Sequence, residues 1–119
     1  MRVIIAGGRD YHNYNTLLNA IVECDFNIQT VVSGGAKGVD ALGERYAEAA
    51  DLPLRIYRAD WETHGRAAGP LRNKKMAENA DALIALWDGK SRGTKNMIET
   101  ATKMGLLVYV KRIDNENNL

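Results

Sequence analysis

Residues 87–99 combine side chains that bind anions with a turn that leads into a helix. The turn follows an apolar run, residues 82–87, and carries the hydroxyls of Ser91 and Thr94. A helix N-terminus offers unpaired N–H groups and about half a positive charge. The cations of this stretch are Lys90, Arg92 and Lys95. This order of strand, polar turn and helix predicts a site for an anion such as a phosphate group.

Two earlier turns have the same character and also follow apolar runs. Residues 7–10 read Gly-Gly-Arg-Asp, and residues 33–38 read Ser-Gly-Gly-Ala-Lys-Gly. Glycine lets a backbone approach a ligand closely and adopt φ values that other residues avoid. The first of these turns is also explained as a tight connection between a strand and a helix. We expect the three turns to meet around one small molecule that carries phosphate.

The common nucleotide fingerprints are absent. No glycine follows Gly8 in the register of G-x-G-x-x-G, which argues against a conventional NAD site. Lys37 is followed by Gly38 rather than Ser or Thr, so the second turn is not a P-loop. Asp40 falls in the first turn of the next helix, where a carboxylate also favours the helix dipole.

Further binding groups are expected at the start of the third long helix. Arg72 and Asn73 offer a guanidinium and an amide for phosphate or ribose, although a solvated basic face explains them equally well. Arg72 and Met76 are four residues apart and share a helix face. Trp61 and His64, in an irregular polar stretch over residues 58–70, either stack on a base or pack that loop.

Apolar runs alternate with helical patterns along the whole chain, which predicts an α/β fold with a parallel sheet. The expected strands are residues 2–6, 30–33, 54–57, 82–87 and 106–110. The expected helices are residues 14–24, 39–50, 70–79 and 95–104. Right-handed crossovers favour the strand order 3-2-1-4-5 with helices on both faces, a Rossmann-like three-layer sandwich. Ligands bind such sheets where the strand order reverses, beyond the carboxyl ends of the strands.

Length and composition fit one globular domain, which we place at residues 1–113, with a flexible tail at 114–119. Sixteen basic and fifteen acidic residues give a net charge of +1, which argues against bulk binding to nucleic acid or membranes. One cysteine, Cys24, excludes an internal disulfide and fits a reducing compartment. The sequence shows neither a signal peptide nor an apolar run of membrane length, so we expect a cytoplasmic protein. We also expect that it needs no metal or cofactor.

Four motifs in this order resemble the SLOG superfamily, and more narrowly its small YspA/YpsA-related branch. They are Ala-Gly-Gly-Arg-Asp, Ser-Gly-Gly-Ala-Lys-Gly-Val-Asp, Gly-Pro-Leu-Arg-Asn-Lys-Lys-Met and Asp-Gly-Lys-Ser-Arg-Gly-Thr. The superfamily includes LOG enzymes, which are cytokinin-activating phosphoribohydrolases, the DNA-processing protein DprA, and domains that sense nucleotide signals. The resemblance implies a Rossmann-like nucleotide-binding fold that often forms a homodimer.

The enzymes of the superfamily carry Pro-Gly-Gly-x-Gly-Thr-x-x-Glu and Arg-x-x-x-Met. Arg72 and Met76 match the second motif, and Gly93-Thr94 match part of the first. Met97 stands where the catalytic glutamate is expected, and Glu99 comes two residues later. A shift of two residues on a helix turns a side chain by about 200°. Lys95 lies four residues before Glu99, so an ion pair between them is the competing explanation for this carboxylate.

The first hypothesis is a module that binds a nucleotide or an ADP-ribose- or NAD-like ligand, as a sensor or a sequestering protein. The alternative is a LOG-like phosphoribohydrolase that uses Glu99 and Arg72 to hydrolyse a nucleoside monophosphate. A DprA-like DNA module is the third, disfavoured by the near-neutral charge. We expect a homo-oligomer, a dimer or higher. The expected ligand-binding residues are Gly7, Gly8, Arg9, Asp10, Ser33, Gly34, Gly35, Lys37, Gly38, Asp40, Arg72, Asn73, Asp88, Ser91, Arg92, Gly93 and Thr94.

Overall fold

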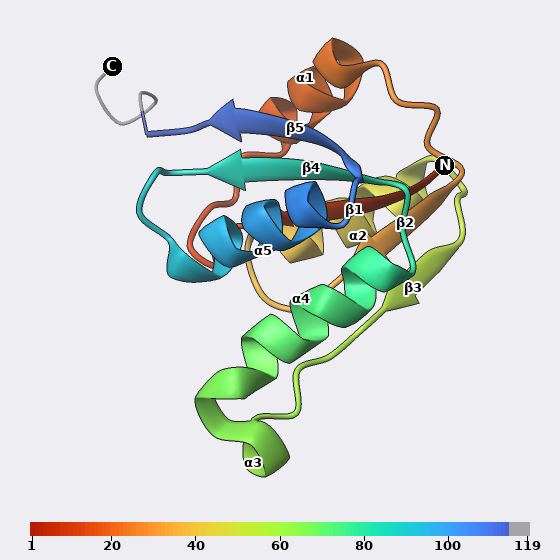
Figure 1. Ribbon diagram of the computed structural model, residues 1–119. Helices are drawn as coiled ribbons and strands as arrows, with labels where there is room; N and C mark the ends of the chain where they lie inside the picture. Colours follow the sequence, from red (N-terminus) through yellow and green to blue (C-terminus); the bar gives the residue numbers. More distant parts are fainter. Residues whose placement is uncertain (115–119) are drawn as a thin grey trace.

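The computed structural model describes residues 1–114 and contains a five-stranded parallel sheet (Figure 1). Its strands lie in the order β3-β2-β1-β4-β5, which confirms the predicted topology. They are β1 (Arg2–Gly7), β2 (Thr30–Ser33), β3 (Leu54–Ile56), β4 (Ala82–Trp87) and β5 (Leu107–Arg112). The predicted tail begins at Asp114, which lies in a turn, and the rest of it falls outside the described residues.

Helices cover both faces of the sheet, as the sequence predicts. They are α1 (Tyr14–Cys24), α2 (Val39–Ala49), α3 (Trp61–His64), the 3-10 helix η1 (Gly65–Ala67), α4 (Ala68–Glu78) and α5 (Arg92–Lys103). Residues of α1 and α2 share a core cluster with one face of β1, while α4 and α5 share another with its opposite face. The result is a three-layer α/β sandwich of Rossmann-like type.

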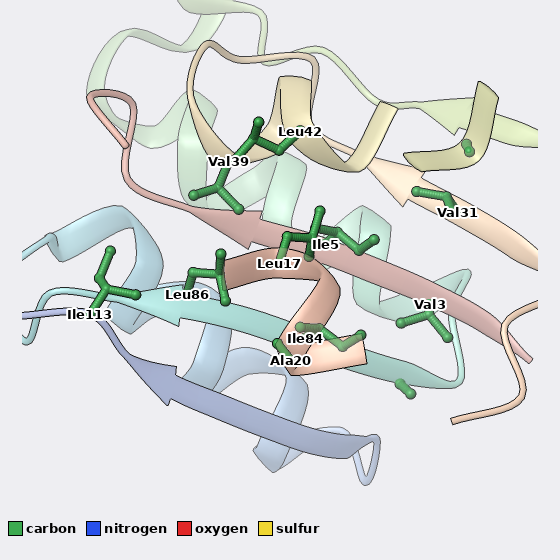
Figure 2. Packing of buried hydrophobic residues seen from close by; sticks show 12 residues of the cluster. Val3, Ile5, Leu17, Ala20, Val31, Val39, Leu42, Ile84, Leu86 and Ile113 are labelled. Atoms are coloured by element: carbon green, nitrogen blue, oxygen red, sulfur yellow. The ribbon is translucent and has the colours of Figure 1, made fainter. Parts of the chain in front are cut away.

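The two cores follow from the alternation of side chains along β1. Val3 and Ile5 point to the α1/α2 side, where they belong to one cluster with Leu17 and Val39 (Figure 2). Ile4 points to the α4/α5 side. Val3, Ile4 and Ile5 are fully buried, because a central parallel strand is covered on both faces.

Residues 58–70 are more ordered than the irregular loop that the sequence predicts. They contain α3 and η1, and α4 begins at Ala68, two residues before the expected start. Asp60 caps α3, because its side chain accepts a hydrogen bond of 3.2 Å from the backbone N–H of Thr63. The four-residue helix is too short for hydrophobic periodicity to reveal. Pro70 lies in the first turn of α4, as expected.

Two other boundaries, toward the carboxyl end of the chain, differ from the prediction by two residues or more. Helix α5 begins at Arg92 rather than residue 95, because Ser91 is its N-cap and accepts a hydrogen bond from the Thr94 N–H. Strand β5 extends to Arg112, paired with Trp87 of β4. Gly105 follows α5 with φ +83°, as expected for a glycine that ends a helix. No helix in residues 1–114 is long and apolar enough to cross a membrane.

The sheet order reverses between β1 and β4, which are direct neighbours. Strand β1 ends at Gly7 and β4 at Trp87. The segment after β1 leads to α1 on one face of the sheet, and the segment after β4 leads to α5 on the other face. Such a divergence leaves a crevice above the carboxyl ends of the strands. The N-termini of α2 and α5 both lie at this edge, because each follows a parallel strand.

Candidate ligand-binding site

A cavity of about 540 Å³ opens at this reversal point, within the range of small-molecule sites. It lies between the end of β1, the start of α4 and the start of α5. Ten of the predicted ligand-binding residues line it. They are Gly7, Arg9, Asp10, Asp40, Arg72, Asn73, Ser91, Arg92, Gly93 and Thr94.

Hydrogen bonds within the turn after β4 hold the α5 corner of the cavity in place. The Asp88 carboxylate accepts hydrogen bonds of 2.8 Å from the backbone N–H groups of Lys90 and Ser91. The Ser91 and Thr94 hydroxyls lie 3.0 Å apart, and the Trp87 indole donates to the Ser91 carbonyl at 3.1 Å. Asp88 therefore shapes the turn rather than lining the cavity, while Ser91 and Thr94 line it.

Asn73 ties α4 to α5 at the floor of the site. Its buried side-chain amide donates to the Asn96 side-chain oxygen at 2.9 Å and to the Gly93 carbonyl at 3.3 Å. Its oxygen accepts a 3.0 Å hydrogen bond from Nε of Arg72. One amide therefore fixes both the distance between the two helices and the direction of the neighbouring guanidinium.

Arg72 crosses the crevice to the turn that follows β2. Its Nη1 donates a 2.7 Å hydrogen bond to the Gly34 carbonyl. A Cβ on residue 34 would lie 2.8 Å from both the Arg72 Cζ and the Asp40 Oδ2, so a larger residue would fit only if these side chains moved. Burial lowers the pKa of Arg72, yet an arginine remains charged at neutral pH. The site therefore contains a fixed, partly buried positive charge.

Asp40 is the carboxylate most enclosed by the cavity wall, with 5% of the residue exposed. Burial raises its pKa, while the N–H of Ala36 and the charge of Arg72 act in the opposite direction. Oδ2 accepts a 3.2 Å hydrogen bond from that N–H. Oδ1 has no hydrogen-bond partner within residues 1–114 and is not enclosed by protein atoms. Because Asp40 lines the cavity, Oδ1 is an open acceptor for a ligand hydroxyl.

Positive charge dominates the cavity wall. Arg9, Arg66, Arg72 and Arg92 line it, against the two carboxylates of Asp10 and Asp40. The whole chain has a net charge of only +1, so the excess is local. A concave surface of this sign concentrates anions.

A second cavity of about 560 Å³ adjoins the first. The two share the wall residues Arg9, Asp10, Ala36, Trp61 and Arg72. Three more predicted residues, Gly34, Gly35 and Lys37, line only this second space. Arg58 also lines it and donates a 3.2 Å hydrogen bond to the Gly35 carbonyl.

Besides Asp88, three predicted binding residues support the turns without lining either cavity. Gly38 has φ +74°, and a Cβ there would lie 2.5 Å from the Arg9 carbonyl oxygen. Gly8 accepts the backbone hydrogen bond from Val39, at 3.1 Å. Ser33 is buried, and its hydroxyl donates to the Glu44 carboxylate at 2.8 Å. The contacts of Gly8 and Gly38 hold the turn after β2 against the turn after β1, and the Ser33 hydrogen bond ties the end of β2 to α2.

Glu99, the expected catalytic carboxylate, does not line either cavity. Its side chain is 66% exposed and lies 3.9 Å from the Lys95 ammonium. This is the i,i+4 ion pair that the sequence offers as the competing explanation. The assignment of Glu99 to catalysis has no support in this geometry, because α5 turns it toward solvent.

Sequence reasoning missed Arg58, Arg66 and Asn96 and left Trp61 undecided. Trp61 lines both cavities, with the Arg9 guanidinium 5.7 Å from its ring centroid. Arg58 follows β3 at the same sheet edge as the glycine turns, so its position in the strand order was a usable signal. Arg66 lies in η1, which no sequence pattern marks. Within residues 1–114, no group of three or more His, Cys, Asp or Glu side chains is arranged to hold a metal.

Comparison with known proteins gives the family. The model of the YspA, cpYpsA-related SLOG family matches residues 1–64. This chain belongs to that family. It also resembles the Gene 61 protein of Mycobacterium phage D29, with 35% identity over 117 residues, 90% of this chain and 93% of that protein. No solved structure matches the chain significantly.

Family membership points to a nucleotide-related function and agrees with the Rossmann-like fold. The matched segment includes the two glycine turns that follow β1 and β2. The other residues that line the first cavity, from Arg66 to Met97, lie beyond the matched segment.

Proposed function

We propose that this SLOG protein binds a nucleotide or a nucleotide-derived ligand such as ADP-ribose or NAD, in the crevice at the carboxyl ends of β1 and β4. The observation that carries the proposal is the meeting of four arginines with the N-terminus of α5 in one cavity. A phosphate group there would accept hydrogen bonds from guanidinium groups and from free N–H groups of the first helical turn. The protein would act as a sensor or a sequestering module.

The remaining groups suit the rest of a nucleotide. Asp40 Oδ1 is placed to accept hydrogen bonds from ribose hydroxyls, since a carboxylate has room for several donors. The half-exposed indole of Trp61 offers a flat apolar surface for a base. Phosphate, sugar and base thus each have a complementary group within one wall.

A thermal-shift screen of the full chain against AMP, ADP-ribose, NAD and cyclic nucleotides tests the proposal. A ligand at a hundred times its Kd adds about 2.7 kcal/mol of stability, a shift of about 10 °C for a domain of this size. Arg92→Ala should abolish most of the shift, because it removes a cation from the α5 corner. Lys103→Ala, at the other end of the same helix and outside both cavities, is the matched control. Absence of any shift with all four ligands would contradict the proposal.

A second candidate function, hydrolysis of the N-glycosidic bond of a nucleoside monophosphate, gains one observation from the structure. Asp40 is a buried carboxylate with a raised pKa that lines the cavity, which is the environment of a general acid or base. Water would add to C1′ as the bond to the base breaks, giving free base and ribose 5-phosphate. Chromatography of AMP after incubation with the protein separates the two functions. Free base that disappears with Asp40→Asn would favour hydrolysis, whereas intact AMP would favour binding alone.

A further inference from the structure

Each of the two cavities has cations of its own. Arg66 and Arg92 line only the first cavity, and Lys37 and Arg58 line only the second. The second cavity is lined by one carboxylate, Asp10, and by four cations, Arg9, Lys37, Arg58 and Arg72, so positive charge is in excess there. Each cavity therefore favours a negative group independently of the other.

The turn after β2 fixes one of the second cavity's cations. Arg58 donates to the Gly35 carbonyl at 3.2 Å, and Gly35 has φ +72°. A Cβ at residue 35 would lie 2.9 Å from Arg58 Nη1, so the side chain packs closely on this turn. The guanidinium keeps free N–H donors, because this hydrogen bond uses one of five. Lys37 forms no hydrogen bond or ion pair with any described residue.

The wall between the cavities suits a nucleoside. Trp61 is 49% exposed, a large apolar area to leave in water on a helix of four residues. Arg9 lies 5.7 Å from its ring centroid and lines both spaces. Asp40 lines the first cavity beside this wall. The residue is largely buried, and its Oδ1, which has no hydrogen-bond partner within residues 1–114, is the acceptor for a sugar hydroxyl. Base and sugar would thus lie between two separate anion sites.

We propose that the preferred ligand is a nucleotide with two phosphoryl groups on different sides of its nucleoside, one bound in each cavity. A nucleoside 3′,5′-bisphosphate and a 5′-phosphorylated dinucleotide share this chemistry. A nucleoside diphosphate does not, because its two phosphates are adjacent and enter one cavity together. The proposal rests on the proposed nucleotide-binding function and specifies which nucleotides the site selects.

Calorimetric titration of the full chain with AMP, ADP, adenosine 3′,5′-bisphosphate and the 5′-phosphorylated adenylyl dinucleotide tests it. The bisphosphate should bind at least about tenfold more tightly than ADP, since each charge-assisted contact in the second cavity contributes to affinity. If the dinucleotide binds as tightly as the bisphosphate, the natural ligand is the end of an oligonucleotide. If the dinucleotide binds more weakly than the bisphosphate, the natural ligand is a free nucleoside bisphosphate. The double variant Lys37→Ala/Arg58→Ala should lose this advantage and bind AMP as before. Arg92→Ala should weaken all four.

Arg45→Ala/Lys103→Ala is the control, because it removes the same formal charge outside both cavities. If the double variant melts early, Lys37→Ala alone serves, since this exposed side chain has no described partner to lose. A bisphosphate that binds no better than ADP, or an advantage that survives the double variant, would refute the two-site ligand while AMP binding leaves the proposed function intact. No binding of any of the four would refute both.

Discussion

Replacing Asn73 should loosen the packing of α4 against α5 and release Arg72 at the same time. Asn73→Ala removes three hydrogen bonds: to the Asn96 side chain, to the Gly93 carbonyl and from Arg72 Nε. At about 1 kcal/mol each, these bonds amount to about 3 kcal/mol of unfolding free energy. For a domain of this size the melting temperature should fall by about 12 °C.

Asn73→Asp should be at least as destabilising, although it has nearly the same shape. A carboxylate cannot donate, so it would face the Gly93 carbonyl and the Asn96 oxygen with repulsive lone pairs. Asn79→Ala, at the C-cap of the same helix, is the control, because it loses one exposed hydrogen bond to the Lys75 carbonyl. Its melting temperature should stay within about 4 °C of the parent chain, since one hydrogen bond is worth about 1 kcal/mol.

The assay is differential scanning calorimetry of the three variants, followed by titration with AMP at a temperature where all are folded. Asn73→Ala should also weaken AMP binding, because Arg72 loses the acceptor that aims its guanidinium. If Asn73→Ala melts like Asn79→Ala, the buried amide does not hold the helices together. If it melts early but binds AMP with unchanged affinity, Arg72 is held by the Gly34 carbonyl alone.

Three further predictions concern carboxylates and a glycine at the site. Asp40→Asn should gain stability over the parent chain as the pH rises from below the ordinary carboxyl value of 3.8 to neutrality. The reason is that the raised pKa of Asp40 makes its ionisation cost folding energy, and paired chemical denaturation at each pH measures the difference. Gly34→Ala should displace Arg72 from the Gly34 carbonyl at a cost of about 1.5–3 kcal/mol and weaken AMP binding, checked by denaturation and titration. Glu99→Gln should leave ligand binding and turnover unchanged and alter stability by less than about 0.5 kcal/mol, because its ion pair is exposed. If Glu99→Gln strongly changed ligand binding, turnover or stability, the side chain of Glu99 would not point from α5 into solvent.

The strand order was predictable because each strand is a short apolar run that ends at a glycine, proline or polar turn. The apolar runs at residues 2–6 and 82–87 read as central strands, and residues 3–6 and 82–86 within them are buried. The same logic placed Gly7, Gly34 and Gly93 at one edge, since parallel strands end together. The family resemblance, confirmed for residues 1–64, rests on the same turns. The predicted homo-oligomer needs its own measurement, for which light scattering of the purified chain is direct.

The choice between Asp40 and Glu99 was not predictable, because it depends on contacts between distant parts of the chain. In the sequence both are carboxylates on helices that follow glycine turns. Asp40 becomes buried because Arg72, 38 residues beyond Gly34, reaches back to the turn beside it. Glu99 has only its helical neighbour Lys95. Long-range packing of this kind raises the pKa of a carboxyl group and leaves one of its oxygens facing the site. Helical spacing in the sequence does not predict such packing.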